Sequence, residues 1–192
     1  MIAIENDHAL CAKKLFTVDD YYRMGEAGIL DENLRTELIN GEIIEISPLG
    51  DRHMECVNRA NAMLVPTLIH KAIVSVQNAV RINNITMPQP DVVLYKFRPD
   101  FYKGRHESDD VLLLIEVADS TLRFDRNVKL PLYASVGIRE VWIEDLRNNR
   151  LLVFRDPDGK NYSTSLTFGA GESIAPLAFP EMTLSIDELL GL

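Results

Sequence analysis

The chain has very little cysteine and no long apolar run. Its 192 residues include two cysteines, Cys11 and Cys56, and neither belongs to a CxxC pair. This pattern argues against a disulfide framework and against a structural zinc site. No segment approaches the roughly 20 apolar residues that a membrane-spanning helix needs, and the N-terminus lacks the long apolar core of a signal peptide. We therefore expect a cytoplasmic protein with no membrane partner.

Positive charge and aromatic side chains are also scarce. The 20 Lys and Arg residues face 29 Asp and Glu residues, which leaves a net charge of -9 at pH 7. Proteins that bind nucleic acid non-specifically are usually basic, because much of their affinity comes from neutralising phosphates. Aromatic residues make up 7% of the chain, which is little for the aromatic-lined cleft of a carbohydrate-cleaving enzyme. Any contact with nucleic acid must therefore use a local basic patch or a bound divalent cation.

The remaining composition is that of a globular protein. Hydrophobic residues make up 46% and charged residues 26%, enough apolar material for one well-filled core. The chain contains no internal repeat, low-complexity tract or Gly/Ser linker. We therefore expect an N-terminal tail over residues 1–15 and a single domain over residues 16–192.

Helical and alternating patterns predict a mixed order of elements. Thr17 and Asp20 form a weak capping box at a helix start, and Asn40-Gly41 between apolar runs is a strong hairpin signal. Further helices are expected over 51–70 (broken by Pro66), 121–135 and 185–190, and strands near 74–82, 91–94, 111–118, 140–145, 151–154 and 162–168. This order predicts an α/β or α+β fold, in which helices flank a central mixed sheet with hairpins near both ends of the chain.

The helix expected over 121–135 has a recognisable apolar stripe. Phe124, Val128, Leu132 and Val136 recur at helical spacing, which predicts the face that packs on the sheet. Pro131 should mark a kink or an early turn, because proline is tolerated only near a helix start.

Two carboxylates stand out because their positions predict burial. Glu116 lies near the end of the strand 111–118, which is apolar on both faces and so belongs in the sheet interior. Asp91 begins the preceding strand, so an antiparallel pairing of the two strands would bring Asp91 and Glu116 together. Buried carboxylates repel each other unless a cation lies between them. With the backbone carbonyl of Val117, they would supply the oxygen ligands that Mg²⁺ prefers.

The same residues also allow other interpretations. Asp91 is suited to a turn, and Glu116 could pair with Lys129 or an arginine without any metal. Glu37 and Glu116 could instead form the acid/base pair of a hydrolase such as a glycosidase. Spacing alone leaves these alternatives open.

Six motifs in order carry a resemblance to a known family. They are Glu37-Leu38-Ile39-Asn40-Gly41-Glu42, Ser47-Pro48 with His53, Pro90-Asp91-Val92-Val93-Leu94, Ile115-Glu116-Val117-Ala118-Asp119-Ser120-Thr121, Asp125 with Lys129-Leu130-Pro131-Leu132-Tyr133-Ala134, and Gly137-Ile138-Arg139-Glu140-Val141-Trp142. From about Phe16 to its end, the chain resembles the Uma-type family of restriction endonucleases, a branch of the PD-(D/E)XK nuclease superfamily.

The resemblance implies a restriction-endonuclease-like sheet and one or two metal ions held by Asp91 and Glu116. The superfamily normally places a lysine two residues after the glutamate, but this chain has Ala118 there. The family resemblance implies that Lys129 of the following helix takes over that role. Glu37 matches the first acidic position of the family, where it would complete the metal shell or hydrogen-bond within the site.

The resemblance also implies supporting residues. His53 would orient a water, a phosphate or Glu37, and Gln89 would add a polar contact before Asp91. Asp125 matches a family position as a supporting or helix-capping residue. Tyr133 matches another as a core contact. Arg123 and Arg126 cluster with Lys129 near the start of one helix and are candidates for phosphate contacts.

The implied activity is hydrolysis of DNA phosphodiester bonds by a Mg²⁺-dependent endonuclease, with Mn²⁺ as a possible substitute. A homodimer is expected, because two copies can reach two DNA strands. The alternative is a catalytically weak or inactive protein that uses the nuclease fold as a regulatory or interaction module. Ala118 and the net negative charge favour this alternative.

Overall fold

The computed structural model describes residues 12–46, 50–103 and 107–192. Residues 1–11 of the expected tail, including Cys11, and the predicted Ser47-Pro48 motif lie outside these ranges. Within the described ranges, no helix combines the length and the apolar character that crossing a bilayer would require.

A six-stranded mixed sheet forms the centre of the molecule. Its strands follow chain order: β3 (Ala72–Val76), β4 (Val92–Lys96), β5 (Val111–Ala118), β6 (Glu140–Asp145), β7 (Arg150–Pro157) and β8 (Tyr162–Phe168). Neighbouring strands are antiparallel except β5 and β6, which are parallel. The apolar strand β5 lies in the sheet interior, as its sequence predicted, and the mixed sheet flanked by helices confirms the predicted fold class.

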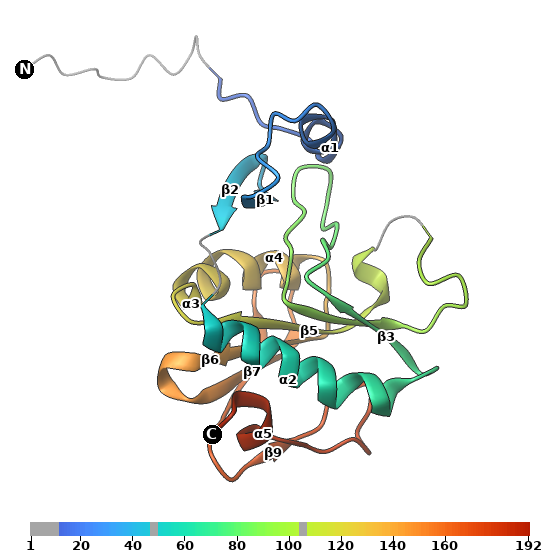
Figure 1. The fold of residues 1–192 in the computed structure, drawn as a ribbon, viewed down its shortest axis with the longest axis vertical. Coiled ribbons are helices and arrows are strands. Elements are labelled where there is room, and N and C mark those ends of the chain that lie inside the picture. The colour runs from blue at the N-terminus through green and yellow to red at the C-terminus, as the bar shows by residue number, and fades with distance from the viewer. Residues whose placement is uncertain (1–11, 47–49, 104–106) are drawn as a thin grey trace, which may run out of the picture.

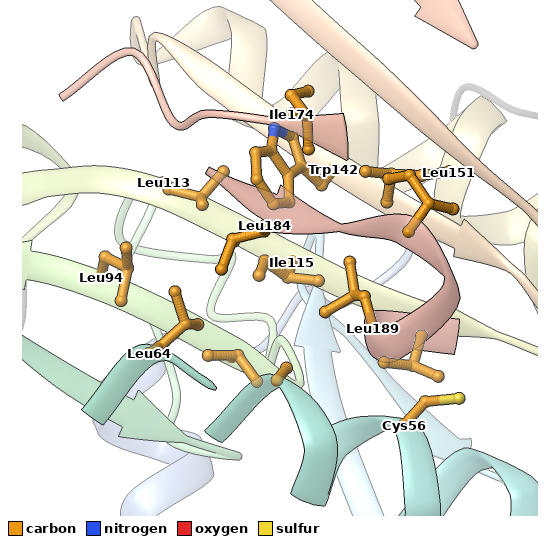
Figure 2. Close-up of a cluster of buried hydrophobic side chains, with 14 of the residues drawn as sticks. Cys56, Leu64, Leu94, Leu113, Ile115, Trp142, Leu151, Ile174, Leu184 and Leu189 are labelled. Atoms are coloured by element: carbon orange, nitrogen blue, oxygen red, sulfur yellow. The ribbon is translucent and has the colours of Figure 1, made fainter. Parts of the chain in front are cut away.

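Helices cover both faces of this sheet (Figure 1). On one face lie α2 (Asp51–Leu68) and the short α5 (Ile186–Leu190). Figure 2 shows Leu64 of α2 and Leu189 of α5 packed with Ile115 and Trp142 of the sheet. On the other face lie α3 (Leu122–Phe124), the π-helical turn η2 (Asp125–Lys129) and α4 (Leu130–Ser135). Alternate residues of β5 therefore enter two separate cores.

The N-terminal elements stand at one end of the molecule (Figure 1). They are α1 (Val18–Glu26) and the hairpin of β1 (Arg35–Ile39) and β2 (Glu42–Ile46). The predicted capping box of Thr17 and Asp20 is confirmed. The predicted turn is confirmed too, with φ values of 51° at Asn40 and 77° at Gly41, as the favoured two-residue hairpin turn requires.

The remaining elements are small. Two short strands, β9 (Ser173–Ile174) and β10 (Leu184–Ser185), pair antiparallel beside α5. Single turns of 3-10 helix, η1 (Ser108–Asp110) and η3 (Leu146–Asn148), precede β5 and β7.

The loop 77–91 joins the N-terminal hairpin to the sheet. The prediction of a strand over 74–82 was wrong beyond Val76, because Val80 and Ile82 make backbone hydrogen bonds within this loop, to Pro88 and Thr86. Their apolar side chains are nevertheless buried, which explains the strand-like pattern. In addition, the Met87 N–H donates to the Leu38 carbonyl at 2.7 Å, so the loop holds β1 beside the sheet.

Two helix predictions also need correction. Pro66 does not break α2, which continues to Leu68; the proline lies on an exposed position of the last turn. The apolar stripe expected over 121–135 is only half-buried. The buried positions are instead Asp125, Lys129, Leu130, Tyr133 and Ala134. Pro131 follows the π-helical turn η2. Proline has no N–H to donate, and because the turn is wider at this point, no standard helical hydrogen bond is lost there.

Candidate active site

The antiparallel pairing of β4 and β5 brings Asp91 and Glu116 side by side. Val92 lies opposite Ile115 in the register, so the residue before β4 reaches the C-terminal end of β5. The Val117 N–H donates to Asp91 Oδ2 at 2.9 Å. Glu116 points to the face covered by η2 and α4, where its neighbours on that face, Leu114 and Ala118, are buried. The two carboxylates meet where the sequence predicted.

A single lysine lies among three carboxylates at this strand end. Lys129 Nζ is 2.9 Å from Glu37 Oε1, 3.2 Å from Glu116 Oε1 and 3.8 Å from Asp125 Oδ1. All four side chains are almost fully buried. They come from β1, β5 and η2, so this cluster links the N-terminal hairpin, the sheet and the helix above it. Lys129 reaches the end of the Glu116 strand, where the family resemblance placed it.

Tyr133 adds a strong hydrogen bond to this cluster. Its hydroxyl donates to Glu116 Oε1 at 2.6 Å, and the ring is fully buried. Asp125, Lys129 and Tyr133 are four residues apart in sequence, so they form one polar line along the helix. The face that packs on the sheet is therefore polar at the site and apolar beyond it.

Asp91 is held by a separate set of donors. His53 Nε2 of α2 lies 3.1 Å from Asp91 Oδ2, and the Gln77 amide donates to Asp91 Oδ1 at 3.4 Å. Burial acts to raise the pKa of Asp91, but the hydrogen bonds from His53 and Val117 and the charge of Lys129 bring this pKa below its usual value. Asp91 is thus a stable anion at the edge of the pocket.

The charged form is less favourable for the other carboxylates of the site. Burial raises the pKa of Glu116 well above its usual value, and the charges of Asp125, Asp91 and Glu37 act in the same direction against the opposing charge of Lys129. Burial likewise raises the pKa of Asp125 to about 6. Burial alone would lower the pKa of Lys129, but its three carboxylate neighbours raise it. The cluster therefore carries more acidic groups than one ammonium group can neutralise.

These side chains line a narrow pocket of about 70 Å³. A space of this size holds a few water molecules or a hydrated ion and is far smaller than a typical pocket for an organic ligand. Its lining includes Glu37, His53, Gln89, Asp91, Glu116, Val117, Asp125 and Lys129. Tyr133 lies behind Glu116, outside this lining, and Gln89 acts through its backbone, whose N–H donates to Glu37 Oε1 at 3.0 Å.

The donor set fits a hard divalent cation, although it is not arranged as a cage. Within the described ranges, no three His, Cys, Asp or Glu side chains form a ready-made metal site. Lys129 instead provides the positive charge among the carboxylates. Glu37 Oε2 is buried and accepts no hydrogen bond in the described part of the chain. An oxygen-rich pocket with an unpartnered carboxylate oxygen suits Mg²⁺ or Mn²⁺.

Three arginines near the site need separate mention. Arg123 and Arg126 are exposed and do not belong to the pocket lining, so their contact with phosphate stays a prediction. Arg35 lines the pocket but was missed. Its only signal in the sequence is its position two residues before Glu37, which places both side chains on one face of β1.

Comparisons with known proteins identify a family and a similar fold. A family model described as "Uma2: Putative restriction endonuclease" matches residues 18–187. Among solved structures, a similar one is "a putative nuclease belonging to DUF820" from Anabaena variabilis ATCC 29413, with 18% identity and a TM-score of 0.64 over 92% of this chain and 98% of that chain. This likeness concerns the fold. Curated proteins gave no match. The family model covers most of the chain and confirms the resemblance seen in the motifs: the protein belongs to the Uma2 family.

Proposed function

We propose that this protein is a Mg²⁺-dependent endonuclease that hydrolyses phosphodiester bonds of DNA, with Mn²⁺ as a possible substitute. The observation that carries the proposal is the convergence of Glu37, Asp91, Glu116 and Lys129 on one narrow, buried pocket. Carboxylates at the ends of two adjacent strands, a lysine that pairs with Glu116 and membership of the Uma2 family support the same chemistry.

Each side chain has a distinct part in this proposal. Asp91 and Glu116, with the Val117 carbonyl and Glu37, would hold the ion. A bound divalent ion lowers the pKa of its water and stabilises charge on a phosphoryl group. Lys129 is positioned to stabilise negative charge on the reacting phosphate. Lys129 lies on the helical segment and not on β5, but its ammonium group still reaches both Glu37 and Glu116.

The supporting residues fix the orientation of these groups. Tyr133 holds one oxygen of Glu116, and His53 holds one oxygen of Asp91. The Gln89 N–H fixes Glu37, and Asp125 adds negative charge beside Lys129. Arg123 and Arg126 are exposed cations on the helical segment that covers the site, and we assign them to DNA phosphates beyond the pocket.

Metal binding and cleavage test this proposal together. We expect calorimetry with Mn²⁺ to give a binding isotherm for the wild type and at least a tenfold weaker one for Glu116→Gln and Asp91→Asn. Nicking of supercoiled plasmid DNA should fall at least a hundredfold in both variants. Glu181→Gln removes an exposed carboxylate and serves as the matched control. Absence of heat with both Mn²⁺ and Mg²⁺ in the wild type would refute metal dependence, and undiminished nicking by Glu116→Gln would reveal a contaminating nuclease.

A second candidate function is that of a regulatory or interaction module. Lys129 already neutralises part of the carboxylate cluster without a metal ion, and the net charge of -9 disfavours binding to DNA. Metal binding without cleavage of any DNA would favour this function. We further propose a cytoplasmic homodimer. Sedimentation at several protein concentrations tests the dimer, and a single species of monomer mass would refute it.

A further inference from the structure

Arg35 enters the same pocket from β1. It lies two residues before Glu37 on the same face of the strand, and its cross-strand neighbour is Ile46, which also lines the pocket. Arg35 is half-buried. Its Nη1 atom is shielded from solvent and has no hydrogen-bond partner in the described part of the chain.

An unpartnered guanidinium nitrogen is unusual in such surroundings. Leaving a buried donor without an acceptor is energetically unfavourable, and arginine is normally paired when it is buried. The pocket contains several carboxylates, yet within the described ranges none of them lies within ion-pairing distance of Arg35. The guanidinium therefore lines the same pocket as the acidic cluster without pairing with any of its described carboxylates.

The other cationic groups of the pocket are already engaged. Lys129 contacts three carboxylates, and His53 contacts Asp91. Arg35 is thus the cation of the described lining that keeps a nitrogen without a hydrogen-bond partner. A group that enters to bind it has to be a hydrogen-bond acceptor, because guanidinium offers only donors, and the positive charge of guanidinium favours an anionic acceptor. It also has to be small or to be the tip of a larger molecule, since the pocket is narrow.

We propose that Arg35 binds a non-bridging oxygen of the phosphate that enters this pocket. The proposal rests on the nuclease function, in which that phosphate is the scissile group of DNA. A planar guanidinium binds phosphate through two parallel hydrogen bonds, which fixes the orientation of the phosphate as well as its position. Arg35 thereby offsets the repulsion that the carboxylates exert on the phosphate.

Inorganic phosphate is the probe for this role, because it needs no cleavage to report binding. Calorimetric titration of phosphate in millimolar Mg²⁺ should give at least a tenfold weaker affinity for Arg35→Gln. Arg35→Lys should fall between this variant and the wild type, because lysine keeps the charge but loses the paired hydrogen bonds. Arg139→Gln is the matched control, because Arg139 is exposed and lies outside the pocket lining. Its phosphate affinity should equal that of the wild type.

Further readouts separate binding from structure. The thermal midpoint and the Mn²⁺ affinity of Arg35→Gln should stay close to those of the wild type. A purely structural Arg35 would lower the midpoint and leave the phosphate affinity of folded protein unchanged. If Arg35→Gln did not fold, Arg35→Lys with wild-type phosphate affinity would overturn the proposal. Equal affinity in the wild type and Arg35→Gln, or no phosphate binding by the wild type, would also overturn it.

Cleavage of plasmid DNA tells this proposal apart from the proposed function. Phosphate binding that depends on Arg35, with no cleavage by the wild type in Mg²⁺ or Mn²⁺, would uphold the phosphate site and refute the endonuclease. Equal cleavage of plasmid DNA by the wild type, Arg35→Gln and Arg139→Gln would uphold the endonuclease and refute the role of Arg35.

Discussion

Replacing Lys129 by methionine removes one positive charge from the centre of the site. Methionine keeps an unbranched side chain of similar length, so the packing against Glu116 and Glu37 changes little. Lys129 is 5% exposed, Glu116 is 3% exposed and Glu37 is 2% exposed. The variant therefore leaves buried carboxylates without the cation that lies 2.9 Å from Glu37 and 3.2 Å from Glu116.

The expected loss of stability is large and depends on pH. Removing one partner of a buried ion pair costs about 3–5 kcal/mol. Burial raises the pKa of Asp125 to about 6 and that of Glu116 well above its usual value. A carboxyl group whose pKa is raised in the folded state is neutral at low pH. The free energy of unfolding then decreases as the pH rises through the folded pKa of that group. The loss should thus approach the full 3–5 kcal/mol at about pH 8 and shrink to about 1 kcal/mol at about pH 5.

Other groups do not disturb this comparison. The pKa of Asp91 is lowered by His53 and Val117 and, as the smallest of the causes, by the charge of Lys129, so its contribution, present at neutral pH and lost in acid, differs little between the two proteins. The pKa of Lys129 is raised by its carboxylate neighbours, so the wild-type ammonium stays charged between pH 5 and pH 8. The difference between variant and wild type therefore reports the carboxylates around Lys129.

Urea unfolding of both proteins near pH 5 and near pH 8, with and without millimolar Mg²⁺, measures this difference. Lys160→Met removes an exposed lysine and should change stability by less than about 0.5 kcal/mol. Mg²⁺ should restore part of the stability of Lys129→Met near pH 8, because the ion can replace the missing charge. An equal loss at both pH values would refute the electrostatic reasoning and indicate a packing defect. No loss near pH 8 would show that Lys129 does not neutralise the carboxylates.

Three further changes test individual contacts. Tyr133→Phe leaves Glu116 Oε1 without its 2.6 Å donor, so urea unfolding should show a loss of about 1–2 kcal/mol, and wild-type stability would argue against this bond. Burial and the charge of Asp91 raise the pKa of Glu144 against a smaller opposing effect of the nearby Cys56 thiol, and neither carboxylate oxygen makes a well-formed hydrogen bond in the described ranges. Glu144→Gln should therefore gain about 1–3 kcal/mol near pH 8 and little below pH 4.5; equal unfolding curves at both pH values would contradict this. Gly41→Ala should lower the thermal midpoint, because its Cβ would lie 2.5 Å from Leu15 Cβ at a φ of +77°; an unchanged midpoint would contradict this.

The meeting of Asp91 and Glu116 could be predicted because it needs only local patterns. Five apolar residues in a row, Val111 to Ile115, identify an interior strand, and a strand just before it in the chain is a natural antiparallel partner. The ends of two such strands then lie together whatever the length of the loop between them. The N-terminal hairpin was equally accessible, because Asn40-Gly41 encodes its own turn geometry.

The helix above the site could not be predicted from hydrophobic spacing. That method looks for apolar residues at helical intervals, and it selected Phe124 and Val128, which are only half-buried. The face that packs on the sheet carries Asp125, Lys129 and Tyr133 because Glu116 lies beneath it. A buried polar line on a helix becomes recognisable only when its partner on the sheet is known. Lys129 was predicted as a site residue because of the family resemblance, and nothing comparable in the sequence pointed to Arg35.

The position of the lysine follows from how β5 is covered. Ala118 is fully buried on the same face as Glu116, in a cluster with Leu130 and Tyr133. A lysine at 118 would need the space that these side chains occupy. The lysine side chain is long and flexible, so the position of its ammonium group matters more than the helix or strand that carries the residue. Because η2 lies over the end of β5, Lys129 delivers that charge to Glu116 from above. The departure at Ala118 is therefore compatible with a complete site, and it is no argument against catalysis.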